Sequence, residues 1–79
     1  MPLETMSNMV PFKHITQILE LTDRLGLNRE WVEIPLTAET SGAVRKLPNG
    51  KLEIVVAADQ PFEEWLKSLE PKITAVMQP

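Results

Sequence analysis

"RKLPNGKLEIVVAADQPFEEWLKSLEPKI" (residues 45–73) is the stretch that decides the fold, because it combines the signals for a hairpin and for a helix. Asn49 and Gly50 lie between two apolar runs, and an Asn-Gly pair in that setting is the strongest short-range signal for a β-hairpin. A two-residue loop at this pair would set Leu47 opposite Leu52, apolar against apolar, and Lys46 opposite Glu53, cation against anion. The sequence therefore predicts two antiparallel strands joined by a tight turn in this register.

The second strand of the hairpin leads into a helix. Residues 54–56 form a continuous apolar run, which is typical of a central strand covered on both faces. Asp59 is the predicted N-cap, and the acidic residues that follow it suit the positive end of the helix dipole. The buried stripe of this helix would consist of Phe62, Trp65, Leu66 and Leu69. Pro71 then predicts a kink or a break, because proline lacks the donor of the helical hydrogen bond.

Two further elements precede the hairpin. A helix is predicted from Pro11, because apolar residues follow it with three-and-four spacing, and Gly26 suits the left-handed position just past its end. Its apolar face would consist of Phe12, Ile15, Ile18, Leu19, Thr22 and Leu25. Residues 31–37 alternate between apolar and other side chains and so predict a strand, which Pro35 favours at a sheet edge.

The order of these elements is α-β-β-β-α. It predicts an α+β fold in which a three-stranded antiparallel meander carries two helices on one face. The C-terminal helix is expected to be kinked or broken at Pro71. We predict a flexible N-terminal arm over residues 1–10 and a single small α+β domain over residues 11–79.

The composition excludes several classes of protein. The 79 residues include no cysteine, which excludes disulfides and thiolate metal sites. No apolar run reaches the roughly 18 residues that a spanning helix needs, and the first residues lack the pattern of a signal peptide. We therefore expect a cytoplasmic protein with no membrane contact. The net charge of −3 gives no long-range attraction to nucleic acid.

Side chains suited to catalysis are sparse. His14 is the single histidine, and one imidazole without cysteine does not supply the three or four ligands of a usual zinc site. We interpret it as a half-exposed surface residue of the first helix. The three glycines are scattered, so they form no phosphate-binding or dinucleotide motif, and no GxSxG motif marks a nucleophile. The sequence predicts a protein that is not an enzyme, with no cofactor, no metal and no small-molecule substrate identified.

Apolar side chains outside the predicted core favour contact with another protein. Trp31 is expected on the strand face opposite to the apolar one, and exposed aromatic residues commonly anchor interfaces. The C-terminal residues add apolar surface that so small a core would leave uncovered. The predicted contact residues are Trp31, Ile73, Val76 and Met77. We therefore predict a small protein-interaction or accessory domain, which contacts a protein partner or self-associates as a homodimer.

Nucleic-acid binding is an alternative, because α-β-β-β-α is also the element order of double-stranded RNA-binding domains. Arg45, Lys46 and Lys51 cluster near the hairpin tip, where they are candidates for phosphate contact. RNA-binding domains of that order place lysines at the start of the last helix, whereas residues 59–65 here are acidic. The sequence therefore favours nucleic acid less than a protein partner.

Residues 15–73 resemble the N-terminal part of the metallopeptidase domains of the ImmA/IrrE type. In that family a helix ending in Leu-Gly leads to strands, then to an apolar strand, and then to the helix that bears HExxH. The matching pieces are "LTDRLGL" (21–27), "NGKLEIVVAADQP" (49–61) and "FEEWLKSLEPKI" (62–73).

The resemblance implies a relative without the metal. When HExxH is aligned with "LEPKI", Glu70 takes the place of the general-base glutamate, and Leu69 and Ile73 take the places of the two histidines. Leucine and isoleucine do not bind zinc, so Glu70 would have no zinc-bound water to activate. A metal-free, peptidase-like regulatory domain is thus a further alternative.

Overall fold

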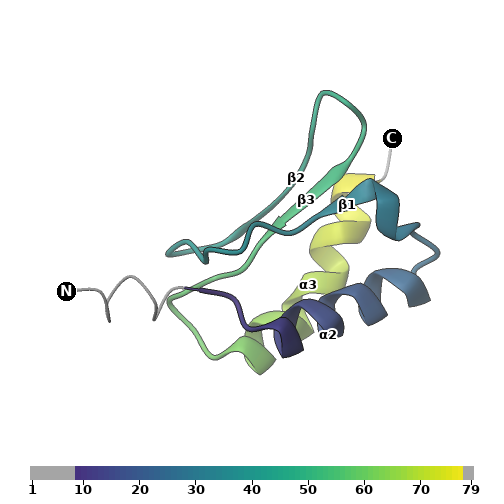
Figure 1. The fold of residues 1–79 in the computed structure, drawn as a ribbon. Coiled ribbons are helices and arrows are strands. Elements are labelled where there is room, and N and C mark those ends of the chain that lie inside the picture. Colours follow the sequence, from purple (N-terminus) through teal and green to yellow (C-terminus); the bar gives the residue numbers. More distant parts are fainter. Residues whose placement is uncertain (1–8, 78–79) are drawn as a thin grey trace.

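The computed structural model describes residues 9–77 of the chain. These residues form two α-helices, a 3-10 helix and one three-stranded sheet (Figure 1). In chain order the elements are α2 (Phe12–Arg24), η1 (Arg29–Trp31), β1 (Val32–Glu33), β2 (Ala43–Lys46), β3 (Leu52–Val55) and α3 (Phe62–Met77). The predicted α+β class and the order of the main elements are confirmed. Within residues 9–77, no helix has the length and hydrophobicity needed to cross a membrane.

The sheet is mixed, with the strand order β1-β3-β2. β3 pairs with β2 in antiparallel orientation but with β1 in parallel orientation, so the predicted antiparallel meander is wrong. The reason lies in the connection after β1, which runs alongside β3 to a parallel bridge between Glu39 and Ala57 before it reaches the far edge. β1 lies at an edge and β3 at the centre, as predicted, but the predicted strand over residues 31–37 is too long: β1 spans only Val32–Glu33, Trp31 belongs to η1, and Pro35 lies outside the strand.

Gly42 is the point at which this connection passes the end of β3. Its φ angle is +64°, and a Cβ atom placed there would lie 2.7 Å from the carbonyl oxygen of Val55. Just before it, the Glu39 amide donates to the Val56 carbonyl (2.9 Å), and the Glu39 carbonyl accepts from the Ala58 amide (2.8 Å). Only glycine fits so close an approach of two backbones in this conformation.

The hairpin turn differs from the predicted two-residue loop. The Leu47 amide donates to the Lys51 carbonyl (2.8 Å), and the Gly50 amide donates to the Leu47 carbonyl (2.9 Å). Gly50 has φ +89°, while no other residue type has positive φ within residues 9–77, Asn49 included. This is a three-residue loop with a single left-handed residue at its end. Pro48 favours it, because proline fixes φ near −65° at the first position of an ordinary turn.

The longer loop shifts the register by one residue. Lys46, not Leu47, pairs with Leu52, and Arg45, not Lys46, pairs with Glu53. The predicted register is therefore wrong, although its pairing of opposite charges survives with a different cation. A one-residue change moves each side chain to the other face of its strand.

The first helix ends as predicted but begins differently. Gly26 has φ +84°, the Leu27 amide donates to the Thr22 carbonyl (2.9 Å) and the Gly26 amide donates to the Asp23 carbonyl (3.0 Å). These are the two bonds of the Schellman motif. Phe12, however, was expected on the buried face and is 81% exposed, because it is the first helical residue and lies beyond the core.

The last helix corrects two predictions. Its first bond runs from the Trp65 amide to the Pro61 carbonyl (3.1 Å), so Pro61 and not Asp59 precedes the first helical residue. Pro71 lies inside one continuous helix, so of the predicted kink or break the break is wrong, and the kink stays a prediction. Leu69 and Ile73 on either side of it are buried at 0% and 1% exposure, and this packing holds the helix together across the missing hydrogen bond.

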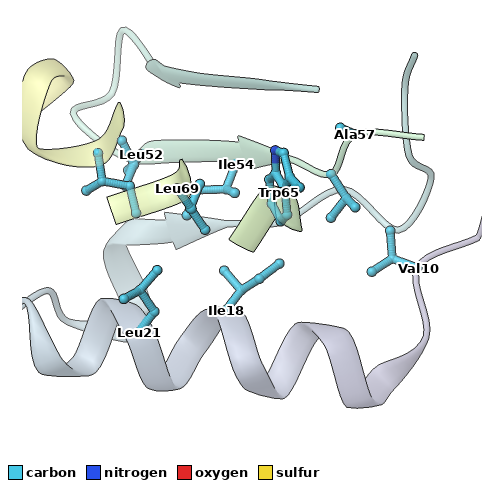
Figure 2. Packing of buried hydrophobic residues seen from close by; sticks show 10 residues of the cluster. Val10, Ile18, Leu21, Leu52, Ile54, Ala57, Trp65 and Leu69 are labelled. Atoms are coloured by element: carbon cyan, nitrogen blue, oxygen red, sulfur yellow. The ribbon is translucent and has the colours of Figure 1, made fainter. Parts of the chain in front are cut away.

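A single core joins the sheet to both helices (Figure 2). Leu52 and Ile54, alternate residues of β3, point toward the helices (Figure 2), and both helices lie on the same side of the sheet, as predicted (Figure 1). The buried cluster consists of Val10, Ile18, Leu21, Leu52, Ile54, Val56, Ala57, Trp65, Leu69 and Ile73. Met9 and Val10 belong to the domain, because Val10 is buried and Met9 pairs with Thr37. The rest of the predicted arm lies outside the described residues.

Candidate functional site

A pocket of about 270 Å³ lies where both helices begin and where the chain leaves β3. We call it the helix-start pocket. Its lining consists of Met9, Val10, Pro11, His14, Ala38, Val56, Ala57, Ala58, Gln60 and Phe62. Only His14 and Gln60 bring polar side chains to it, but the exposed surface of the pocket is nearly as polar as apolar, so it is a mixed hollow and not an apolar one.

An aromatic stack holds one wall of the pocket. The rings of His14 and Phe62 are parallel within 5°, and their centroids are 3.8 Å apart. Phe62 in turn lies against the buried Trp65, with centroids 5.7 Å apart. The stack ties the start of α2 to the start of α3. His14 is half-buried, as expected of it, but sequence analysis missed its partner and the pocket.

Three large apolar side chains are exposed at this end of the molecule. Phe12 is 81% exposed, Leu36 59% and Met9 51%. The Val10 amide donates to the Leu36 carbonyl (2.7 Å), so the segment that carries Met9 runs beside the one that carries Leu36. Phe12 follows directly after Pro11, which lines the pocket. Together these side chains put apolar surface next to the helix-start pocket.

Carboxylates adjoin the lining of the same pocket in the chain. Glu39, Asp59 and Glu63 are exposed, and each is the chain neighbour of a residue in the lining. Within residues 9–77, none of the three forms an ion pair. Lys13, beside His14, is the cation next to the lining in the chain.

The predicted phosphate contacts lie on the sheet, and two of the three are already paired. Arg45 bonds to Glu53, and Lys51 lies 3.6 Å from Glu33, which is opposite Glu53 in the register. The hydrogen bond and the charge of Glu53 raise the pKa of Arg45 above its usual value. Lys46 is exposed and makes no ion pair within the described part of the chain. The arrangement neutralises the open sheet face.

The predicted partner contacts differ in their exposure. Trp31 is 51% exposed and Met77 43%, as expected of contact residues, and Val76 is half-buried. Ile73 is 1% exposed and belongs to the core, so its place among the surface contacts is wrong. Trp31 rests beside the hairpin turn, since a Cβ atom on Gly50 would lie 3.6 Å from its ring.

Comparison of the chain with protein-family models, curated proteins and solved structures finds no significant match. The resemblance to the ImmA/IrrE-type domains accordingly stays a prediction. Leu69 and Ile73, aligned with the metal-binding histidines, both point into the core, whereas Glu70 is exposed. Within residues 9–77, no three histidine or carboxylate side chains gather as metal ligands would.

One repeated signal in the sequence marks the site. A Pro-Phe pair starts each helix, as Pro11-Phe12 in α2 and as Pro61-Phe62 in α3. Proline suits the start of a helix, where no donor is lost, and the aromatic residue after it needs a partner surface. In α3 that surface is His14, while in α2 the ring of Phe12 remains in solvent.

Proposed function

We propose that the chain is a small, non-enzymatic protein-interaction domain and that its contact surface is the end around the helix-start pocket. One observation carries the proposal: the large apolar side chains of Met9, Phe12 and Leu36 are exposed beside a pocket of about 270 Å³. Exposed apolar side chains that gather at a hollow are typical of sites that bind a partner.

The energetic reason is the unused burial of these side chains. Covering apolar surface contributes about 25 cal/mol per Å², and aromatic residues next to a pocket commonly supply most of the energy of an interface. Phe12 is the most exposed of the large apolar residues described and gains most from being covered. A partner that buries Phe12 would remove from water an apolar side chain that the fold itself leaves exposed.

The test compares two matched surface variants in capture experiments. One carries Met9→Ser, Phe12→Ser and Leu36→Ser, and the control carries Trp31→Ser and Met77→Ser at the other exposed apolar side chains. We expect proteins captured by the wild type to be lost with the first variant and kept with the control. Equal capture by both variants, with circular dichroism showing both folded, would contradict the proposal.

Self-association is the form of this proposal that needs no foreign partner. Sedimentation over a dilution series separates it from a heterologous contact. A dimer that dissociates on dilution, and that the Phe12 variant abolishes, supports contact between two copies through the same surface. A strict monomer at high concentration would leave only the foreign partner.

A peptidase-like regulatory domain is a second candidate, and the unbroken α3 around Glu70 favours it. That role predicts that the exposed face with Glu70 takes part in contacts. Glu70→Lys should then reduce capture, with Lys67→Glu on the same helix as its matched charge change. If Glu70→Lys captures the same proteins as the wild type, this candidate fails.

A further inference from the structure

We infer that Asn49 is a site of spontaneous deamidation and that the hydrogen bonds of its own turn restrain the reaction until the turn opens. The site lies at the hairpin end of the molecule, so its test is separate from that of the proposed contact surface. The order of residues supplies the reacting groups, and the turn supplies the restraint.

Asn49 has the least hindered neighbour of any asparagine in the chain. The sequence has three asparagines, Asn8, Asn28 and Asn49, and only Asn49 is followed by glycine. Asparagine is thermolabile because the backbone nitrogen of the next residue attacks its side chain. Glycine has no Cβ atom to hinder that attack. Asn49 and Gly50 are both exposed, so water reaches them.

The reaction has two steps and needs only water. The Gly50 nitrogen attacks the side-chain carbonyl carbon of Asn49, and the new C–N bond closes a succinimide ring. The side-chain nitrogen leaves as ammonia and takes the proton that the Gly50 nitrogen gives up. Water then opens the ring at either of its C–N bonds, which yields aspartate or isoaspartate. Both products add a negative charge to the hairpin turn.

The folded turn engages both reacting groups in other bonds. The Gly50 amide, which must lose its proton, donates to the Leu47 carbonyl (2.9 Å). The Asn49 Oδ1 atom accepts from the Lys51 amide (3.0 Å), which fixes the rotation of that side chain. Each group is therefore held in the turn before it can react.

The backbone of the turn opposes ring closure as well. In an ordinary turn the third residue, here Asn49, has a ψ angle of about 0°. The succinimide ring needs the Gly50 nitrogen to eclipse the Asn49 Cβ atom, which is a large rotation about the same bond. Such a rotation breaks the bond between Gly50 and Leu47, so the turn must open before the ring closes.

The population of the open turn then sets the rate. Local opening is fast compared with so slow a reaction, so the folded protein reacts at the rate of the open chain multiplied by the open fraction. Two ordinary hydrogen bonds reduce that fraction by about tenfold or more. Trp31 adds a contact over the same glycine, since a Cβ atom on Gly50 would lie 3.6 Å from its ring.

Mass spectrometry of peptide fragments measures the reaction in the full chain. Folded protein and protein unfolded in guanidinium chloride are incubated at the same pH and temperature. We expect Asn49 to react more slowly in the folded protein by about tenfold or more, and both rates to rise with pH. Equal rates in the two states, or no reaction at Asn49 in the unfolded chain, would overturn the inference.

Asn28 is the internal control. Its side chain accepts from the Glu30 amide (2.9 Å) as that of Asn49 does from Lys51, but Arg29 follows it and has a Cβ atom. We expect Asn28 to stay intact while Asn49 reacts in the unfolded chain. Reaction at Asn28 as fast as at Asn49 would mean that the following glycine does not select the site.

Two proline variants test whether the turn itself restrains the reaction. Pro48 fixes φ at the first position of the turn, so Pro48→Gly should speed the reaction of the folded protein by about two- to fivefold. The rate of the unfolded variant should equal that of the unfolded wild type. Pro71→Gly makes the same change inside α3 and should leave both rates unchanged. Equal acceleration by the two variants, or acceleration by neither, would show that opening of this turn does not control the rate.

Discussion

The two ends of the molecule use their aromatic side chains in opposite ways. At the hairpin end, Trp31 lies beside the turn at Gly50, and Lys51 is paired with Glu33. At the helix-start end, Phe12 is 81% exposed beside an open pocket. One end is therefore closed by its own contacts, whereas the other leaves large apolar side chains exposed, as the proposed contact surface requires.

The two tryptophans give the largest contrast in stability. Trp65 is 1% exposed and packs beneath the helix-start pocket, while Trp31 is 51% exposed at the hairpin end. Trp65→Ala should lower the free energy of unfolding by about 3–5 kcal/mol, because it leaves a large cavity in the core. Trp31→Ala should lower it by about 1 kcal/mol or less, as for other surface changes. Urea unfolding followed by circular dichroism measures both, and similar losses would contradict the contrast.

Replacing two glycines, one at each end of the molecule, should give a smaller difference in the free energy of unfolding. Gly42→Ala puts a Cβ atom 2.7 Å from the Val55 carbonyl oxygen, whereas at Gly50 the nearest atom, on Trp31, is 3.6 Å away. Both have positive φ. We expect a loss of about 2–3 kcal/mol for Gly42→Ala and of about 1 kcal/mol for Gly50→Ala. Equal losses in urea unfolding would mean that the backbone relaxes at Gly42.

The sequence predicts the hairpin but not its register, and the reason is local competition. The Asn49-Gly50 pair favours a two-residue loop in which both residues have positive φ. Pro48 favours an ordinary turn one residue earlier, and then Gly50 alone takes the left-handed conformation. Only the second arrangement brings Arg45 to Glu53.

The sequence also did not predict the parallel pairing of β1 or the helix-start pocket, because both depend on contacts between residues far apart in the chain. The parallel pairing of β1 arises from the connection that passes β3 at Gly42, and a single glycine among small residues gives no sign of that path. The pocket requires His14 and Phe62, far apart in the sequence, to meet in a stack. The helices, the central strand and most of the core follow from periodicity, because burial on one face imposes it.

α3 spans from the helix-start pocket to Met77, and Pro71 is its weakest point. Pro71→Ala should raise the free energy of unfolding by about 1–2 kcal/mol, because the helix regains a donor while the unfolded chain gains some freedom. Thr74→Ala, at an exposed position one turn later, is the control and should change it by less than about 0.5 kcal/mol. A loss of stability in Pro71→Ala would show that the helix needs a bend there.

The stack of His14 on Phe62 should have the smallest effect on the free energy of unfolding, and a double-mutant cycle can isolate it. A double-mutant cycle with His14→Ala and Phe62→Leu removes differences in helix propensity and leaves the coupling between the two rings. We expect a coupling of about 0.5–1.5 kcal/mol in the free energy of unfolding, as for other aromatic pairs. A matching cycle between His14→Ala and Trp31→Ala joins the two ends, and its coupling should lie within about 0.5 kcal/mol of zero. If the first cycle also gives zero, the two rings do not stabilise each other, and the stack does not hold the pocket wall.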